Sequence, residues 1–345
     1  MVYEKSNPKD PNVLKDFTKT IDKIRDRHTN TVITMAEAVM AMKHSATSVQ
    51  KNGKNRNGNK QPRYMQNIQY FLDRFYTSRI SSRMLINQHT ALFTELENVN
   101  SVKSLRLDGS GASSMFGSID TKCEIAPIIE SAYEAARDLC EYHYMTAPEL
   151  DFRPVNAVPG DDSPPEKLSF VYVPSHLHHI MFELIKNSMR ATIERHGDHT
   201  VYLPPIKIRA IKGREDLTIR VSDQGGGIPR RKTDLLFEYL YTTAPTPQLL
   251  SSCDMPGNFG MGTPAPIAGH GYGLPLSRLY ARYFNGDLTL SSIEGYGTEV
   301  FVYLQALESE AKERLPVYHE TGSKKIYEAK LTPLDWTQHK SANFP

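Results

Sequence analysis

Four short motifs, met in order along the chain, combine the residue types that a nucleotide pocket requires. They are Glu183-Leu-Ile-Lys-Asn187, Asp223-Gln-Gly-Gly-Gly227, Gly269-His-Gly-Tyr-Gly-Leu274 and Gly295-Tyr-Gly-Thr298. Any one alone is weak evidence, because a glycine-rich run is most often a tight turn. Together they supply a carboxylate, a metal-ligating amide, an acid for an adenine amine and backbone amides for phosphates. Their order and chemistry predict ATP binding.

The first motif falls on a predicted helix that begins near Pro174. One polar stripe of this helix is formed by His179, Glu183, Asn187 and Arg190. The amide oxygen of Asn187 can ligate Mg²⁺ while the ion keeps phosphate oxygens and waters. Glu183 can take a proton from an attacking hydroxyl and His179 can orient that carboxylate, a form of catalysis that contributes about 10²- to 10⁴-fold. The alternative is an exposed helix face with a chance His–Glu pair.

The second motif begins where a predicted strand ends. Asp223 precedes three glycines there, so its carboxylate can face a cavity while the backbone passes close to a ligand. A buried carboxylate can accept a hydrogen bond from the adenine amino group, and losing that bond costs about 1–3 kcal/mol. The alternative is an aspartate that only opens a glycine turn.

The third motif precedes a predicted helix with Pro275 in its first turn. Exposed amides at a helix start bind anions, so this loop is predicted to hold phosphates. Residues 251–268, rich in glycine, proline and small residues, are predicted to form a mobile lid over the nucleotide. The chain has no Walker loop, no Rossmann fingerprint, and neither the His-Arg-Asp nor the Asp-Phe-Gly signature of eukaryotic-type protein kinases. A different ATP-binding fold is required.

Two kinds of element must position these motifs. Apolar residues at helical spacing predict helices over residues 13–42, 68–96 and 125–143, which make the first part an all-helical bundle. Beyond residue 148, strands are predicted at 169–173, 206–211, 217–221, 288–290 and 300–304, the second and third as a hairpin, with helices over 174–196 and 274–284. This pattern indicates a helical domain (1–150), an α/β sandwich domain (151–310) and a tail (311–345).

Composition excludes several classes of protein. A net charge of +2 over 345 residues gives no strong field for nucleic acid, and no apolar run approaches about 18 residues. We therefore expect no nucleic-acid partner and no membrane span. Residues 50–63 are basic without an acid and are interpreted as a solvated loop rather than a nucleic-acid arm. Three widely spaced cysteines fit a reducing compartment.

The four motifs resemble the N box and the three G boxes of the GHKL (Bergerat) ATP-binding fold, shared by type II topoisomerases, Hsp90-type chaperones, histidine kinases and MutL-type repair proteins. Longer stretches narrow the resemblance to the mitochondrial pyruvate dehydrogenase kinases and their branched-chain sister kinases. They include Tyr172-Val-Pro-Ser-His176, Tyr241-Thr-Thr-Ala-Pro-Thr-Pro247, Asn67-Ile-Gln-Tyr-Phe-Leu-Asp-Arg-Phe75 and Arg314-Leu-Pro-Val-Tyr318. The resemblance runs from about Asn7 to Gln338. It implies an α plus α/β fold, in which a four-helix-type bundle precedes a GHKL sandwich.

The resemblance implies a protein-serine kinase that uses Mg-ATP to phosphorylate and inactivate the E1α subunit of the pyruvate dehydrogenase complex, and so regulates glucose oxidation. Glu183 would be the base, assisted by His179, and Asn187 the Mg²⁺ ligand. The implied ATP-binding residues are Glu183, Asn187, Arg190, Asp223, Gly225, Gly227, Thr242, Thr243, Gly269, His270, Gly271, Tyr272, Gly273, Leu274 and Thr298. His270 stands where the family usually has phenylalanine.

The resemblance also implies regulation, assembly and location. His28, Ser78, Arg79 and Arg83 match a pocket for pyruvate or dichloroacetate. From the residues alone, Arg79 and Arg83 could both face a small carboxylate, or could be surface arginines of an amphipathic helix. The Asp335-Trp336 pair matches the tail that crosses between subunits of a homodimer. The implied partner is the lipoyl domain of E2, and the implied location is the mitochondrial matrix.

The sequence departs from the family at its N-terminal end, where the transit peptide, the first bundle helices and the lipoyl-docking residues would precede Asn7. We therefore expect a truncated bundle, lower stability than a longer form and impaired E2 docking. Two alternatives to the leading function stay open: a branched-chain 2-oxoacid dehydrogenase kinase, and an ATP-binding regulator without catalytic activity.

Overall fold

The computed structural model describes residues 10–51, 63–102, 114–160, 164–197, 202–242, 271–307 and 312–313. Several predictions lie outside the described residues. They are those for Thr243, Gly269, His270, Asp335, Trp336 and the lid over 251–268. None of the described helices is long and apolar enough to cross a membrane.

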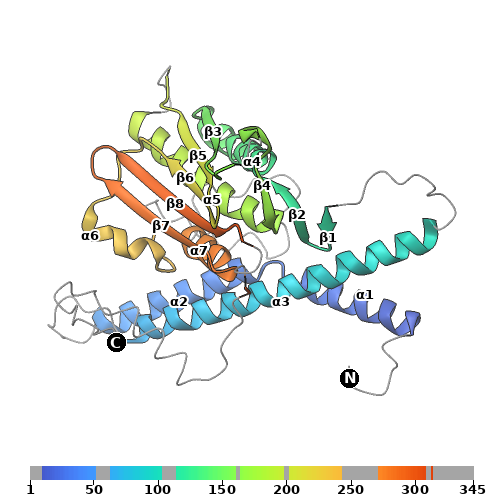
Figure 1. Ribbon diagram of the computed structural model, residues 1–345. Helices are drawn as coiled ribbons and strands as arrows, with labels where there is room; N and C mark the ends of the chain where they lie inside the picture. The colour runs from blue at the N-terminus through green and yellow to red at the C-terminus, as the bar shows by residue number, and fades with distance from the viewer. Residues whose placement is uncertain are drawn as a thin grey trace, which may run out of the picture.

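The structure describes three helices in the first part of the chain: α1 (Pro11–Arg27), α2 (Thr31–Lys51) and α3 (Arg63–Val102). The last of these runs beneath the sheets in Figure 1. The single helix predicted over residues 13–42 is wrong, because α1 ends at His28. The hydroxyl of Thr29 donates to the Asp26 carbonyl and that of Thr31 to the His28 carbonyl, both at 2.8 Å. Such local side-chain bonds satisfy the carbonyls of a helix end and compete with continuation of the helix.

Five strands form the main sheet, in the order β3-β5-β6-β8-β7. They are β3 (Leu150–Asn156), β5 (Ile206–Lys212), β6 (Asp216–Ser222), β7 (Asp287–Ile293) and β8 (Gly297–Gln305). The predicted hairpin is confirmed as the antiparallel pair β5 and β6. β3 was missed by the sequence patterns; it contains Pro154, which a strand tolerates at the sheet edge where β3 lies.

A second, three-stranded sheet joins β1 (Met115–Phe116), β2 (Ile119–Glu124) and β4 (Ser169–Tyr172). The expectation that the first part is all helical is therefore wrong at residues 115–124. β2 buries only Cys123 among its six residues, so its sequence lacks the alternation that marks a half-buried strand.

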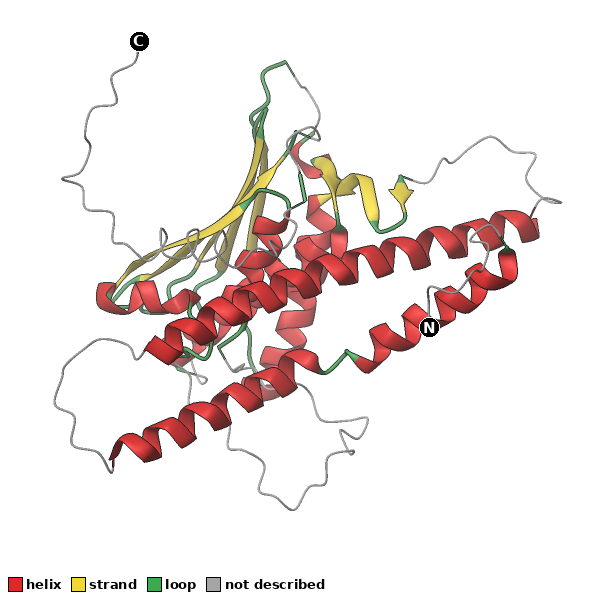
Figure 2. Cartoon of the chain, turned by 90° about the horizontal axis from the view of Figure 1, so that it is seen from below, coloured by secondary structure: helices red, strands yellow, loops and turns green. Residues whose placement is uncertain are grey.

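Helices α5 (Pro174–His196) and α7 (Gly273–Tyr283) cover one face of the main sheet, and α4 (Ile125–Tyr144) packs against α5 (Figure 2). Three short helices complete this part: η1 (Pro165–Lys167), α6 (Arg230–Thr233) and η2 (Asp234–Phe237). One continuous core includes residues of α4, α5, α7 and the inner face of the sheet. α4, expected as a helix of the bundle, thus packs into the core of the α/β part.

A second, smaller core joins the helical part to the α/β part. Its buried members are Ala36, Val39, Leu72, Tyr76, Tyr239, Tyr272 and Leu276. The first four come from α2 and α3, and the last three from segments that follow η2 or begin α7. The region between the two parts is therefore packed largely by aromatic rings.

Candidate functional site

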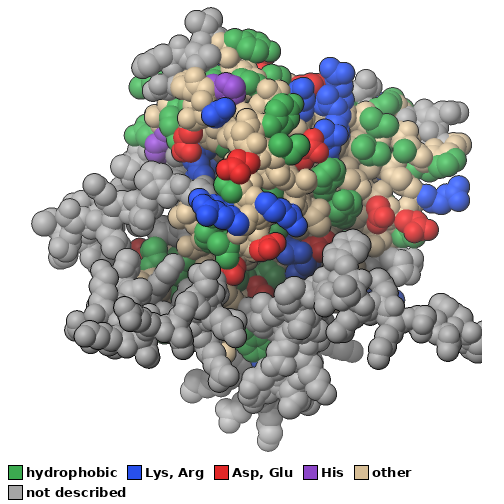
Figure 3. Space-filling view, turned by 90° about the vertical axis from the view of Figure 1, so that its left-hand side faces the viewer, with side chains coloured by type: hydrophobic (Ala, Val, Ile, Leu, Met, Phe, Trp, Pro, Cys, Tyr) green, Lys and Arg blue, Asp and Glu red, His purple; other side chains and the backbone are tan. Residues whose placement is uncertain are grey.

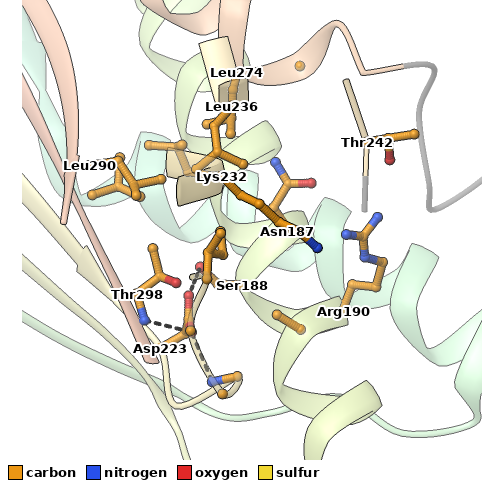
Figure 4. Close-up of a pocket in the computed structure, with 18 of the residues that line it drawn as sticks. Asn187, Ser188, Arg190, Asp223, Lys232, Leu236, Thr242, Leu274, Leu290 and Thr298 are labelled. Carbon is orange, nitrogen blue, oxygen red and sulfur yellow. Dashed lines mark hydrogen bonds between the residues drawn. The ribbon is translucent and has the colours of Figure 1, made fainter. Parts of the chain in front are cut away.

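A cavity of about 490 Å³ lies between α5, the loop after β6, the segment after η2 and the start of α7. It brings together Glu183, Asn187, Arg190, Asp223, Gly225, Gly227, Thr242, Gly271, Gly273, Leu274 and Thr298. Figure 4 shows Asp223, Ser188 and Thr298 at one end, with Asn187, Arg190 and Thr242 toward the other. Described residues of all four predicted motifs thus line one cavity.

Asp223 is the buried acid of the cavity, with 6% of its surface exposed. Its carboxylate accepts hydrogen bonds from the Gly225 amide at 2.9 Å and from the Thr298 amide and Ser188 hydroxyl at 3.2 Å each. Burial raises the pKa of Asp223, and these three donors act in the opposite direction. The donors fix the orientation of the carboxylate, so that it can accept from one further, planar ligand group.

Glu183 and Lys186 form a largely buried ion pair on α5. The Lys186 Nζ lies 2.8 Å from the Glu183 Oε1 and 5.1 Å from the centre of the Phe182 ring. Lys186 is 7% exposed, and a buried ammonium requires a partner of opposite charge. The sequence did not single out Lys186, although it lies inside the first motif. The sequence feature that could have identified Lys186 is its position on the buried side of an otherwise amphipathic helix.

His179 lies one turn before Glu183, buried against the ring of Tyr280 with the ring centres 4.8 Å apart. Burial lowers the pKa of His179, and the neighbouring Glu183 carboxylate partly opposes this. The Nε2 atom has no hydrogen-bond partner. No hydrogen bond joins His179 to Glu183 in the described structure, so its role in orienting the carboxylate stays a prediction.

Two glycines at the start of α7 make close contacts that a side chain would prevent. Gly273 lies directly against Glu183, since a Cβ at this position would come within 2.3 Å of the Glu183 Oε2. Gly271 has a φ of 78°, and a Cβ there would lie 2.5 Å from the Tyr241 carbonyl oxygen. The side chain of Tyr272, the N-cap residue of α7, makes no capping hydrogen bond. The first amides of α7 therefore stand open at the cavity, where an anion can bind.

Tyr272 differs from the other residues of the third motif. Its side chain is 4% exposed and packs against Tyr76 and Tyr239, with ring centres 5.8 and 5.3 Å away. It is absent from the cavity lining, so only its backbone is close to the cavity. Other lining residues had not been identified from the sequence: Ser188, Tyr241, Lys232, Leu236, Leu290 and Val300. The last three supply apolar walls, which have no motif of their own.

The residues predicted to bind a regulatory carboxylate lie where α1 meets α3. The Arg79 Nη2 donates to the backbone carbonyl of His28 at 2.6 Å. Burial lowers the pKa of Arg79, and the positive charge of Arg83 adds to this shift. The structure thus brings His28, Arg79 and Arg83 together, with Ser78 adjacent in sequence on α3.

Asn187 is the one predicted metal ligand, and its amide lies in the cavity (Figure 4). Among the described residues there is no group of three or more His, Cys, Asp or Glu side chains that could hold a metal ion. This arrangement fits Mg²⁺, which keeps waters and substrate phosphates as most of its ligands, and does not fit a metal held by protein alone.

Two family models match the chain. The model described as mitochondrial branched-chain alpha-ketoacid dehydrogenase kinase matches residues 3–120. The model described as histidine kinase-, DNA gyrase B- and HSP90-like ATPase matches residues 172–308, which contain all four motifs.

Curated relatives match nearly the whole chain. A mitochondrial pyruvate dehydrogenase (acetyl-transferring) kinase isozyme 4 from Rhinolophus ferrumequinum is 44% identical over 334 residues, which are 97% of this chain and 71% of the relative. A mitochondrial pyruvate dehydrogenase (acetyl-transferring) kinase from Drosophila melanogaster is 45% identical over 98% of this chain and 73% of its own. Human isozyme 3 is 45% identical over 98% of this chain and 74% of its own.

Proposed function

The chain belongs to the mitochondrial pyruvate dehydrogenase (acetyl-transferring) kinase family and has its kinase activity, and from this premise we propose how its residues perform that activity. The substrate we propose is a serine of the E1α subunit, whose phosphorylation inactivates the complex. The observation that carries the proposal is the cavity with a fixed acid, Asp223, at one end and Glu183 beside Asn187 at the other. Its length and polarity suit an adenine ring at the first end and phosphates at the second.

The adenine amino group would donate to Asp223, while Leu236, Leu290 and Val300 pack against the ring faces. Asn187 would ligate Mg²⁺, and the bound ion would neutralise charge on the phosphates. The open amides of α7 from Gly273 onward would hold the terminal phosphate. Thr242 and Arg190 would complete this end, together with Thr243, Gly269 and His270.

The serine hydroxyl would lose its proton to Glu183 as its oxygen attacks the terminal phosphorus of ATP. The bond from that phosphorus to the bridging oxygen would break, and ADP would leave with the bonding electron pair. Lys186 would help to orient this base, because its ammonium lies 2.8 Å from the Glu183 Oε1. Gly273 keeps the other carboxylate oxygen close to the phosphate-binding loop. His179 would restrict the rotation of Glu183 by packing. Catalysis in this site is mostly positioning and charge stabilisation.

We propose that residues 1–150 carry regulation, 151–310 the ATP site and 311–345 the tail. His28, Ser78, Arg79 and Arg83 would hold pyruvate or dichloroacetate. The proposed homodimer is supported by the face of the main sheet that no described helix covers, where Tyr303 and Ile211 are each 38% exposed and Phe301 stacks on Tyr303. Asp335 and Trp336 would cross between its subunits.

The protein is mitochondrial like its named relatives, and we propose the matrix as its compartment, with the E2 lipoyl domain as a docking partner. Nucleic acid is not among the proposed partners. Figure 3 shows Lys and Arg side chains interspersed with Asp and Glu over the described part of one face, in keeping with the net charge of +2.

The test is incubation with Mg-ATP and purified E1 proteins, followed by mass spectrometry of phosphoserine. We expect phosphate on the pyruvate dehydrogenase E1α, and none with the Asp223→Asn variant. Phosphate on the branched-chain E1α alone would instead assign the sister activity. Phosphate on neither, with ADP still bound, would indicate a regulator without catalytic activity.

A further inference from the structure

The segment that follows η2 forms part of the cavity wall and packs in the small core between α3 and α7. Tyr241 and Thr242 line the cavity, and Tyr239 and Leu240 belong instead to the small core shared with α3. Leu240 has a φ of 65°, a conformation that a non-glycine residue adopts only when its surroundings enforce it. Contacts with α3 therefore help to set the position of this segment.

Gln69 of α3 holds the backbone of Tyr239 with both ends of its amide. The Tyr239 amide donates to the Gln69 Oε1 at 2.8 Å, and the Gln69 Nε2 donates to the Tyr239 carbonyl at 3.2 Å. Gln69 is 7% exposed and Tyr239 is 2% exposed. Each of these groups would otherwise be a buried polar atom without a partner, which is costly. The pair therefore fixes both the distance and the register between α3 and the cavity wall.

Asp73, one turn further along α3, holds the side chain of the same tyrosine. The Tyr239 hydroxyl donates to the Asp73 Oδ1 at 2.9 Å. Burial raises the pKa of Tyr239 well above its ordinary value and the Asp73 carboxylate adds to the shift, so the hydroxyl stays protonated and continues to donate. Tyr239 is thus held at three atoms by one face of α3.

The aromatic rings extend this contact to the phosphate-binding loop. Tyr76 of α3 lies against both Tyr239 and Tyr272, with ring centres 5.7 and 5.8 Å away. Tyr272 directly follows Gly271, whose backbone lies against that of Tyr241. Both sides of the predicted phosphate end of the cavity therefore rest on the same turns of α3.

We propose that Gln69 and Asp73 are positioning residues for the nucleotide, which act through Tyr239 to hold Tyr241 and Thr242 in the shape that binds ATP. The proposal rests on the assignment of the cavity as the ATP site. Neither side chain lines the cavity, so the effect on ATP is indirect. The affinity for nucleotide then depends on where α3 lies relative to the α/β part.

Gln88 offers a matched control on the same helix. Its amide holds the turn between β1 and β2 in the same way, since its Nε2 donates to the Phe116 carbonyl at 3.0 Å and its Oε1 accepts from the Ser118 amide at 2.9 Å. Methionine at either position keeps the length of the side chain and removes these bonds. At Gln88 it also removes a third bond, which the Ser118 hydroxyl donates to the Oε1 at 2.7 Å. Gln69→Met thus removes the hydrogen bonds to Tyr239, whereas Gln88→Met removes those to the turn between β1 and β2.

Isothermal titration with ADP and steady-state kinetics with pyruvate dehydrogenase E1 would test the proposal. For Gln69→Met we expect the Kd for ADP and the KM for ATP to rise about 5- to 20-fold, while kcat and the KM for E1 stay near wild type. For Gln88→Met we expect nucleotide affinity within about twofold of wild type. Equal nucleotide affinities in the two variants would overturn the proposal.

A second pair of variants covers the case in which Gln69→Met fails to fold. Tyr239→Phe removes the hydroxyl bonded to Asp73, and Tyr76→Phe removes a buried hydroxyl that has no hydrogen-bond partner. We expect weaker ADP binding in the first variant only, and identical binding in both would contradict the proposal.

The Asp223→Asn variant tests the assignment of the cavity as the ATP site separately from the positioning role of Gln69 and Asp73. If it binds ADP normally, the cavity assignment fails and the proposal with it; if it loses ADP while Gln69→Met and Tyr239→Phe bind normally, only the proposal fails.

Discussion

The α/β part and the helical part of this chain hold their helices in different ways. α4, α5 and α7 share one continuous apolar core with the sheet. α2 and the first part of α3 share a small core, which is closed by Tyr239, Tyr272 and Leu276 of the other part, while Ile80 and Met84 of α3 extend into the large core. Several large apolar side chains of the helical part are exposed: Phe17, Ile24, Ile33, Met42, Phe71 and Leu85. Where apolar burial is scarce, directional hydrogen bonds such as those of Gln69 and Gln88 fix the position of α3 relative to the segments it contacts. A position fixed by a few hydrogen bonds changes when the helix moves by a small distance.

The largest expected effect falls on chemistry in the α/β part. Glu183→Gln should lower kcat by about 10²- to 10⁴-fold, because the attacking hydroxyl loses its proposed base, while ADP binding stays near wild type. The melting temperature should fall, because the buried Lys186 loses its partner of opposite charge. Radiolabel transfer to E1 would measure kcat. Glu141→Gln, which breaks an exposed ion pair with Arg137 on α4, serves as the control and should keep full activity. Phosphate transfer by Glu183→Gln at the wild-type rate would disprove the role of Glu183 as base.

A matched pair of leucines tests the comparison directly. Leu177 of α5 and Leu72 of α3 are both fully buried, the first in the large core and the second in the small one. Leucine-to-alanine changes in cores cost about 2–5 kcal/mol, and the cost is smaller where neighbours can collapse into the cavity. We expect Leu177→Ala near the upper end and Leu72→Ala near the lower end, by urea unfolding. The reverse order would mean that the helical part is the more tightly packed of the two.

The smallest expected effect is a dependence of stability on pH that originates in the α/β part. Burial against Tyr280, Tyr283 and Phe284 lowers the pKa of His176 to about 4, from an unfolded value of 6.5. The unfolded chain therefore binds the proton first as pH falls. The stability is complete above about pH 6.5 and declines toward pH 4, by up to about 1.4 kcal/mol per pH unit.

Urea unfolding at several pH values would measure this slope. His176→Phe should reduce the slope without abolishing it, because burial also lowers the pKa of His179. His143→Gln, at an exposed position on α4, should leave the wild-type slope intact. If His176→Phe keeps the full slope, the protons are taken up elsewhere.

The sequence predicted what depends on local chemistry. α5 and its polar stripe, the β5–β6 hairpin and α4 to within one or two residues all follow from spacing along the chain. The break at His28 was missed because threonine hydroxyls cause it, and hydroxyls do not disturb apolar periodicity. Gln69 was missed because its partner, Tyr239, lies 170 residues away. Contacts between residues so far apart in sequence form only when the chain folds, and they leave no pattern in the sequence of either segment.

Because α3 is long, a small tilt about one of its contacts produces a larger displacement at another. Gln69 and Gln88 lie about 28 Å apart along the helix at 1.5 Å per residue. A tilt of about 5° around Gln88 would move the helix at Gln69 by roughly 2.5 Å, enough to break hydrogen bonds of ordinary length. Arg79 and its contact with His28 lie between these two points. A small molecule that pushes on α3 there would have its displacement amplified at the wall of the ATP cavity, with Gln88 as the fulcrum.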